Sequence, residues 1–348
     1  MGVIHPDITK AQTLPSNFYH DEEIYRQLIT KFHTEWTFIG MESTISDGTV
    51  LPVLIGDIPM LMTKENGIIR CVSNVCTHRG MILCDGQQQT STITCPYHGR
   101  TFSLCGKMKQ MPKFDQVDNF PSESDNLPHA NVVNWHGLIF ASLDLEASFE
   151  DYFSAIEDRM SFVDFEKLER QEKMAREHEI SANWMLYVDN YLEGFHIPYV
   201  HKGLNSVIDY KNYETEIFAG AVLQVGYAVN GEECFDIPQW HQDSGKSIAA
   251  YYWWIFPNLM LNFYPWGLSI NVVIPQGVNS TKVIYHGLVS DAKKFGKGAG
   301  GDLDTVEYED QWIVESCHKG MRSVLYNRGR YSPTMERGVH HFHRLLTD

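Results

Sequence analysis

The sequence contains little positive charge for its length. Its 348 residues include 44 acidic side chains and only 28 Lys and Arg, so the formal net charge at pH 7 is −16. A chain this acidic repels phosphate backbones, and we expect no nucleic-acid partner. Long hydrophobic runs are also absent, because the most apolar stretch, residues 251–264, is interrupted by Pro and Asn. We therefore expect no membrane span.

Cysteine is scarce as well. The seven cysteines are an odd number in a long chain, which argues against a disulfide framework. The first residues, MGVIHPDITK, lack the basic start and the apolar stretch of a secretion signal. We therefore expect a cytoplasmic protein whose cysteines are buried, catalytic or metal-bound. The length of the chain predicts two domains.

Helical and β patterns occupy separate parts of the sequence. Apolar residues at helical spacing predict a helix within 14–33, and short alternating strands dominate from Trp36 to about Leu145, with a hairpin signal at 65–67. Pro198 is expected to bend or end a later helix. The remaining pattern predicts helices over 147–160, 166–180, 182–201 and 304–327, and strands between 215 and 288.

Two short motifs in the β-rich region each combine one cysteine with one histidine. They are Cys76-Thr-His78 and Cys95-Pro-Tyr-His98. Structural zinc sites usually pair like ligands within one motif. The mixed order suits a [2Fe–2S] cluster with two thiolates on one iron and two imidazoles on the other, which is a Rieske centre. A zinc knuckle or a chance cluster is the alternative.

A Rieske cluster transfers electrons and does no substrate chemistry, so we expect a second site. The segment from Glu193 to His201 contains His196 as well, and two His with one carboxylate form the facial triad of non-haem Fe(II). Glu193 and His196 would share one helix face, and Pro198 can turn His201 toward the same point. The third ligand stays open among the nearby and downstream carboxylates, which are Glu193, Asp304, Glu307, Glu309, Asp310 and Glu315.

One glycine-rich segment resembles a nucleotide site only in spacing. Gly296, Gly298 and Gly301 fit G-x-G-x-x-G, but no strand precedes them and no helix opens within the motif. We interpret this segment as a mobile surface loop. The chain would then lack its own NAD(P)H or flavin site, and its electrons would come from a separate reductase.

The segment CTHRG…CPYHGRTF resembles the Rieske signature of the ring-hydroxylating and related Rieske non-haem iron oxygenases. Respiratory Rieske proteins carry an additional Cys where Tyr97 stands, so the oxygenase type is favoured. Arg100 occupies a position that is usually Trp in the oxygenases, and we expect it to change how this loop packs on a neighbouring subunit. The resemblance extends over nearly the whole chain, from LPSNFY to MERGVHHFHRLL.

The resemblance implies an α+β protein with two domains. An all-β Rieske domain at 36–146 would hold the [2Fe–2S] cluster. A helix-grip (START-like) catalytic domain would combine residues 1–35 and 147–348. The cluster ligands would be Cys76, His78, Cys95 and His98.

The resemblance also completes the second site. It implies that His196, His201 and Asp310 bind a mononuclear Fe(II). Glu193 would then be an electron bridge between subunits, joining a ligand His to a Rieske His of the adjacent subunit in a head-to-tail homotrimer. NAD(P)H would act only through a partner reductase of the flavin or ferredoxin type.

The acidic residue at the bridge suggests the substrate class. Glu193, where aromatic dioxygenases usually have Asp, resembles the choline, carnitine and betaine monooxygenase branch. We therefore expect a terminal oxygenase that uses O2 to hydroxylate or N-demethylate a small substrate such as a methylated amine. Trp253, Tyr264 and Trp266 are candidates for a pocket that binds a cation through ring faces, although an aromatic strand that fills a hydrophobic core is the favoured interpretation. The alternatives are a dioxygenase of aromatic acids and a Rieske electron carrier without oxygenase activity.

Overall fold

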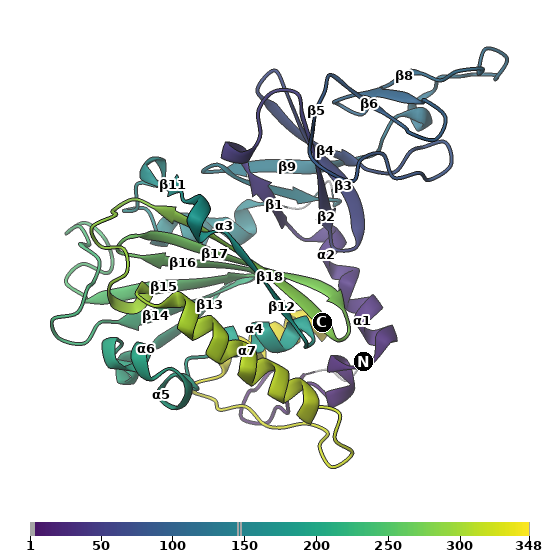
Figure 1. Cartoon of the computed structure of the whole chain (residues 1–348). Helices are drawn as coiled ribbons and strands as arrows, with labels where there is room; N and C mark the ends of the chain where they lie inside the picture. The colour runs from purple at the N-terminus through teal and green to yellow at the C-terminus, as the bar shows by residue number, and fades with distance from the viewer. Residues whose placement is uncertain (1–3, 145, 147, 348) are drawn as a thin grey trace. The chain divides into compact units, whose positions relative to one another are not determined.

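The computed structural model describes residues 4–144, 146 and 148–347, and the chain divides into two compact units (Figure 1). One unit is Ile29–Ala147, and the other combines Met1–Leu28 with Ser148–Asp348. Helices and strands are segregated as the α+β prediction requires, and that prediction is confirmed. Leu145, where we expected the β-rich region to end, lies outside the described residues.

The unit Ile29–Ala147 is built almost entirely of antiparallel strands. Its larger sheet has the strand order β1-β10-β9-β4-β3-β2-β5, and a second sheet has the order β6-β7-β8. The hairpin expected at 65–67 is present, because Asn66 and Gly67 adopt positive φ between β3 and β4. The strands are β1 Thr37–Met41, β2 Thr49–Ile55, β3 Ile58–Glu65, β4 Ile68–Ser73, β5 Gln88–Gln89, β6 Thr92–Thr94, β7 Thr101–Ser103, β8 Met108–Gln110, β9 His129–Trp135 and β10 Leu138–Ser142.

Arg100 packs inside this unit. It is 2% exposed, donates to the Asp125 carboxylate, and its guanidinium carbon lies 5.9 and 5.4 Å from the ring centroids of Phe102 and Phe120. Arg100 is thus held within its own unit, and its expected effect on packing against a neighbouring subunit stays a prediction. The Thr77 hydroxyl donates to the Asp125 carbonyl at 2.8 Å, so Asp125 ties together the two segments that carry the Cys/His motifs.

Removing the negative charge of Asp125 should destabilise this unit. We expect Asp125→Asn to lower its free energy of unfolding by about 3 kcal/mol, because the buried Arg100 guanidinium then lacks a counter-charge. Thermal unfolding followed by circular dichroism measures the effect. Asp118→Asn, which changes an exposed carboxylate of the same unit, is the matched control. Equal melting temperatures for the two variants would contradict the assignment.

The second unit contains one large antiparallel sheet. Its strand order is β11-β18-β17-β16-β15-β14-β13, and β12 also pairs with β18. The strands are β11 Glu169–Arg170, β12 Arg176–Ile180, β13 Glu214–Ile217, β14 Ala221–Tyr227, β15 Ile248–Ile255, β16 Leu259–Tyr264, β17 Gly267–Gly277 and β18 Ser280–Val289. The predicted strands between 215 and 288 are thus confirmed.

Helix α4 is the centre of the second unit. It contacts β17 of the sheet, while α7 and α8 both contact α4, and Figure 1 shows α7 running across the sheet beside it. Its residues from Trp184 to Val188 are all buried. None of the described helices is long and apolar enough to cross a membrane. The helices are α1 Glu22–Ile29, α2 Lys31–Thr34, α3 Glu150–Arg159, α4 Trp184–Tyr191, α5 Ile197–Val200, α6 Lys202–Val207, α7 Leu303–Gly320 and α8 Arg337–Thr347.

Three of the predicted helices are wrong or incomplete, and the one expected over 304–327 ends at Gly320. Residues 166–180 contain β11 and β12 rather than a helix, because β12 pairs residue by residue with β18 and this pairing outweighs the helical propensity of its charged side chains. The helix expected over 182–201 stops at Tyr191, and Pro198 lies in the first turn of the new helix α5. Pro is favourable there because its missing N–H would have no helical partner.

Candidate functional site

The two Cys/His motifs form loops of the same shape. Cys76 and His78 follow β4, whereas Cys95 and His98 lie between β6 and β7. In the first loop the Cys76 carbonyl accepts from the amide four residues later at 3.0 Å, and the Cys95 carbonyl does so in the second loop at the same distance. The accepted amides belong to glycines with φ of 70° and 75°. Each loop therefore presents its Cys and His on one tight turn.

The two cysteines of these loops lie together, and so do the two histidines. Both cysteines are 2% exposed, and burial, together with a hydrogen bond to the Cys95 side chain, raises the pKa of Cys76, so the two thiols lie side by side. The rings of His78 and His98 are 4.9 Å apart between centroids. Nδ1 of His98 is buried without a hydrogen-bond partner among the described residues, as expected of a nitrogen reserved for a metal. Two thiols and two imidazoles grouped in this way fit a [2Fe–2S] cluster.

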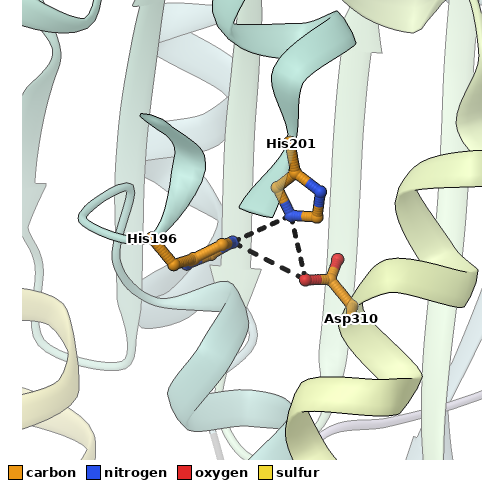
Figure 2. Close-up of side chains that lie close together, drawn as sticks. All are labelled: His196, His201 and Asp310. Carbon is orange, nitrogen blue, oxygen red and sulfur yellow. Dashed lines mark hydrogen bonds and ion pairs between the residues drawn. The ribbon is translucent and has the colours of Figure 1, made fainter. Parts of the chain in front are cut away.

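Three side chains converge in the second unit (Figure 2). His196 precedes α5, His201 ends it, and Asp310 projects from α7. Nε2 of His201 lies 3.0 Å from Nε2 of His196 and 3.0 Å from Oδ1 of Asp310, and the third side of the triangle is 3.6 Å. Two atoms that ligate one divalent metal at about 2.1 Å and at right angles are about 3.0 Å apart. The triangle therefore fits one face of an octahedral metal ion.

Hydrogen bonds fix the outer nitrogens of both imidazoles. Nδ1 of His196 lies 2.6 Å from Glu193, and Nδ1 of His201 lies 2.7 Å from Glu309. Because a carboxylate only accepts, each Nδ1 carries a proton and each Nε2 presents a lone pair toward Asp310. Burial acts to lower the pKa of His201, but the two acidic neighbours raise it overall. A metal cation at the centre of the triangle satisfies all three groups.

Glu193 lies outside the triangle formed by His196, His201 and Asp310. It lies after the end of α4 rather than on a helix face with His196, and its carboxylate accepts from the His196 backbone amide at 3.1 Å as well as from Nδ1. It therefore lies at the opposite edge of the ring from the triangle. Asp310 is the carboxylate that joins the two His, and Asn190 donates to the same Asp310 oxygen at 2.6 Å.

A cavity adjoins the three side chains. The space open to the centre of a water-sized sphere is about 90 Å³. Its wall combines aliphatic side chains with an unusual number of aromatic hydroxyls. The tyrosines that line it are Tyr187, Tyr191, Tyr213, Tyr252 and Tyr264. The polar and acidic residues near them include Asn190, Asn262, Ser269, Asn271 and Glu307.

Of the three aromatic residues expected in a pocket, Tyr264 alone is in the cavity wall. Trp253 is fully buried and contacts the Phe218 ring, because side chains alternate along β15 and its neighbour Tyr252 points into the cavity. Trp266 is also fully buried and stacks on Tyr264 with ring centroids 5.2 Å apart. The pocket prediction for Trp253 and Trp266 is corrected, since both fill the core behind the wall.

The glycine-rich segment contributes to the cavity. Ala299 and Gly300 are buried, and Ala299 lies in the cavity wall. A Cβ on Gly300 would lie 2.4 Å from Nε1 of Trp266 and 2.8 Å from Cγ of Tyr264. Gly300 therefore allows the backbone to close against these rings. The expectation of a surface loop is wrong for this part of the segment.

Two folding patterns and two ligand sets define the class of protein. Residues 165–348 match the protein family described as "Ring hydroxylating alpha subunit (catalytic domain)", and residues 35–121 match the family described as "Rieske [2Fe-2S] domain". Chloroplastic choline monooxygenase of Arabidopsis thaliana is 30% identical, with 97% of this chain and 83% of that protein covered. The carnitine monooxygenase oxygenase subunit of Escherichia coli K12 is 27% identical, with 97% and 93% covered.

Solved structures share the fold. The quaternary ammonium Rieske monooxygenase CntA bound to L-carnitine superimposes with a TM-score of 0.77 at 22% identity, covering 98% of this chain and 96% of that chain. Naphthalene 1,2-dioxygenase from Rhodococcus gives 0.75 at 20% identity, with 96% and 93% covered.

The fold and the two sites are those of a Rieske non-haem iron oxygenase. The chain belongs to the ring-hydroxylating alpha subunit family. It is a terminal oxygenase that carries a Rieske [2Fe–2S] cluster and a mononuclear iron, uses O2, and receives electrons from a separate reductase. Family membership excludes the alternative of an electron carrier without oxygenase activity.

Proposed function

We propose that this oxygenase hydroxylates or N-demethylates a small methylated amine in the cavity beside His196, His201 and Asp310. The observation that carries the proposal is the tyrosine-lined cavity that reaches all three side chains. Electron-rich aromatic faces bind methylated ammonium groups well. The similarity to choline and carnitine monooxygenases favours the same substrate class.

The roles of individual residues follow from their positions. His196, His201 and Asp310 would hold the mononuclear iron, which supplies the site of O2 activation when it is bound. Glu193 and Glu309 would keep each Nδ1 protonated and each imidazole oriented. Cys76, His78, Cys95 and His98 would hold the cluster. We assign residues 36–146 to the cluster domain, and residues 1–35 and 147–348 to the catalytic domain.

We also propose a head-to-tail homotrimer in which Glu193 bridges to a cluster His of the neighbouring subunit. An exposed aromatic patch beside the triad supports this assembly: Tyr199, Tyr308 and Trp312 are 77, 62 and 68% exposed and surround a hollow that also includes Glu309. A patch of this kind favours an interface. None of the seven cysteines forms a disulfide, which agrees with a cytoplasmic location.

Substrate-dependent O2 uptake tests the proposal. The purified oxygenase with a surrogate reductase and NADH is supplied with choline, other methylated amines and aromatic acids, and products are identified by mass spectrometry. We expect O2 uptake coupled to product formation with methylated amines. Peroxide release without product would mark uncoupled turnover and would not count as activity. Turnover of aromatic acids with no reaction of methylated amines would overturn the proposed substrate class in favour of the dioxygenase alternative.

A further inference from the structure

One carboxylate of the cavity has no part in the metal site. Oε2 of Glu307 accepts from the hydroxyls of Tyr187 and Tyr285, each at 2.6 Å, and Oε1 accepts from the Asn271 side-chain amide at 3.3 Å. All three donors are neutral. Among the residues that the structure describes, Glu307 is therefore held in the cavity wall by hydrogen bonds from neutral groups and not by an ion pair.

Glu307 lacks a positively charged partner. Among the residues that the structure describes, none of the Lys, Arg or His side chains forms an ion pair with it. Arg176 contacts the ring of Tyr285, with its guanidinium carbon 4.9 Å from the centroid, but pairs with Asp304 at 2.9 Å. A carboxylate away from bulk water is costly unless a counter-charge or hydrogen bonds compensate it.

The rest of the cavity is equally short of positive charge. Within the described part of the chain, no Lys or Arg lines it, and its acidic residues are Glu193, Glu307 and Asp310. Glu193 is bound to His196, and Asp310 belongs to the triad. A substrate carboxylate would meet no Lys or Arg side chain of the described residues here and would be repelled by Glu307. A substrate cation would find in Glu307 the one acidic group not already engaged by the imidazoles.

We propose that Glu307 selects the substrate of this oxygenase by pairing with the positive charge of a methylated amine that carries no carboxylate. This inference rests on the proposed function and narrows it. Glu307 would favour choline-like substrates, which bear a cation and a hydroxyl. It would disfavour carnitine-like and betaine-like substrates, which also bear a carboxylate.

The ionisation of Glu307 is sensitive to its surroundings. Burial and then the charge of Asp310 raise the pKa of Glu307 to about 7, while the hydroxyls of Tyr187 and Tyr285 and the Arg176 guanidinium act to lower it. The two tyrosines stay neutral, because burial raises their own pKa values far above 10. A cation binds the ionised carboxylate. The affinity for a cationic ligand, relative to that for a neutral analogue, should therefore rise as the pH increases through about 7.

Binding to the holoenzyme under anaerobic conditions tests this inference. Calorimetry measures the dissociation constants of choline and of 3,3-dimethylbutan-1-ol, a neutral analogue in which carbon replaces the ammonium nitrogen. We expect the wild-type protein to bind choline about 30-fold more tightly than the neutral analogue. In Glu307→Gln the two constants should agree within about threefold. Glu315→Gln, which neutralises another acid on α7 outside the cavity, should keep the wild-type ratio.

Two measurements on the wild-type protein do not depend on the folding of a variant. Choline should bind at least about tenfold more tightly than carnitine, and the ratio of choline to neutral-analogue affinity should fall between pH 8 and pH 6. An unchanged ratio in a folded Glu307→Gln protein, or equal affinity for carnitine and choline, would overturn the inference. If choline is oxidised but the ratio is unchanged, the role of Glu307 alone fails. If no methylated amine binds or reacts, the proposed function fails with it.

Discussion

Asp310→Ala is expected to abolish turnover and to remove the mononuclear iron while the cluster irons remain. Asp310 supplies the single carboxylate of a triangle whose other corners are the Nε2 atoms of His196 and His201. Two imidazoles alone hold ferrous ion weakly, so we expect iron affinity to fall by more than about 100-fold. Metal analysis after gel filtration measures the loss, and the visible absorption of the [2Fe–2S] cluster should be unchanged.

Asp304→Ala is the matched control for this variant. Asp304 lies on the same helix, α7, but its side chain is 69% exposed and pairs with Arg176 outside the triangle. We expect it to retain the full iron content and most of the turnover. Retention of the mononuclear iron by Asp310→Ala would show that another carboxylate is the ligand. Glu309 would then be the next candidate, since it lies 2.7 Å from the other nitrogen of His201.

Glu193→Gln is expected to keep both metal centres and to lose steady-state turnover by at least about 100-fold. A Gln oxygen can still accept the proton of His196 Nδ1, which now lies 2.6 Å from the carboxylate, so the ligand stays oriented. The amide lacks the negative charge proposed to link His196 with the neighbouring subunit. Rapid-mixing spectroscopy should find the prereduced cluster reoxidised slowly in the presence of substrate and O2.

Glu309→Gln is the matched comparison for Glu193→Gln, because each carboxylate accepts a hydrogen bond from Nδ1 of one imidazole of the triangle. Glu309 holds His201 as Glu193 holds His196, with nearly equal distances to Nδ1. If these carboxylates only orient ligands, the two variants should lose similar activity. A bridging role for Glu193 predicts a loss of no more than about tenfold in Glu309→Gln. Loss of the mononuclear iron in Glu193→Gln would instead identify Glu193 as a ligand.

The cluster motifs were predictable because each is local. Within each motif the ligands lie within four residues of each other, so sequence spacing and one glycine turn fix the geometry of a loop. The iron site was only partly predictable. His196 and His201 are local, but Asp310 is 109 residues from His201, and only the resemblance to a family singled it out from the other acids of its segment. The structure singles out Asp310 because its Oδ1 lies 3.0 Å from Nε2 of His201.

The errors of sequence interpretation have a common origin in tertiary contacts. Residues 166–180 carry many charged helix formers, yet β12 is held as a strand by pairing with β18. Trp253 was expected in the cavity, but the register of β15 turns Tyr252 inward instead.

Glu307 was considered only as a competing iron ligand, because nothing in the sequence distinguishes a buried acid from an exposed one on an acidic helix. Its role depends on Tyr187, Asn271 and Tyr285, which come from α4, β17 and β18. These residues are distant in sequence and meet only when α7 packs over the sheet. The packing of α7 on the sheet therefore gives Glu307 hydrogen bonds from neutral groups but no ion pair among the described residues.

The sequence by itself determined the class of cofactors and the separation of a β-rich region from an α+β region, and it singled out the local Cys/His and His/His pairs that we propose as ligands. It could do so because metal chemistry requires particular residue types at short, rigid spacings. Only the tertiary structure decided which distant carboxylate lies beside the two imidazoles, which aromatic side chains reach the cavity, and which cavity acid forms no ion pair with the described residues. Those outcomes depend on strand register and helix packing, which sum many weak contacts that no short motif encodes.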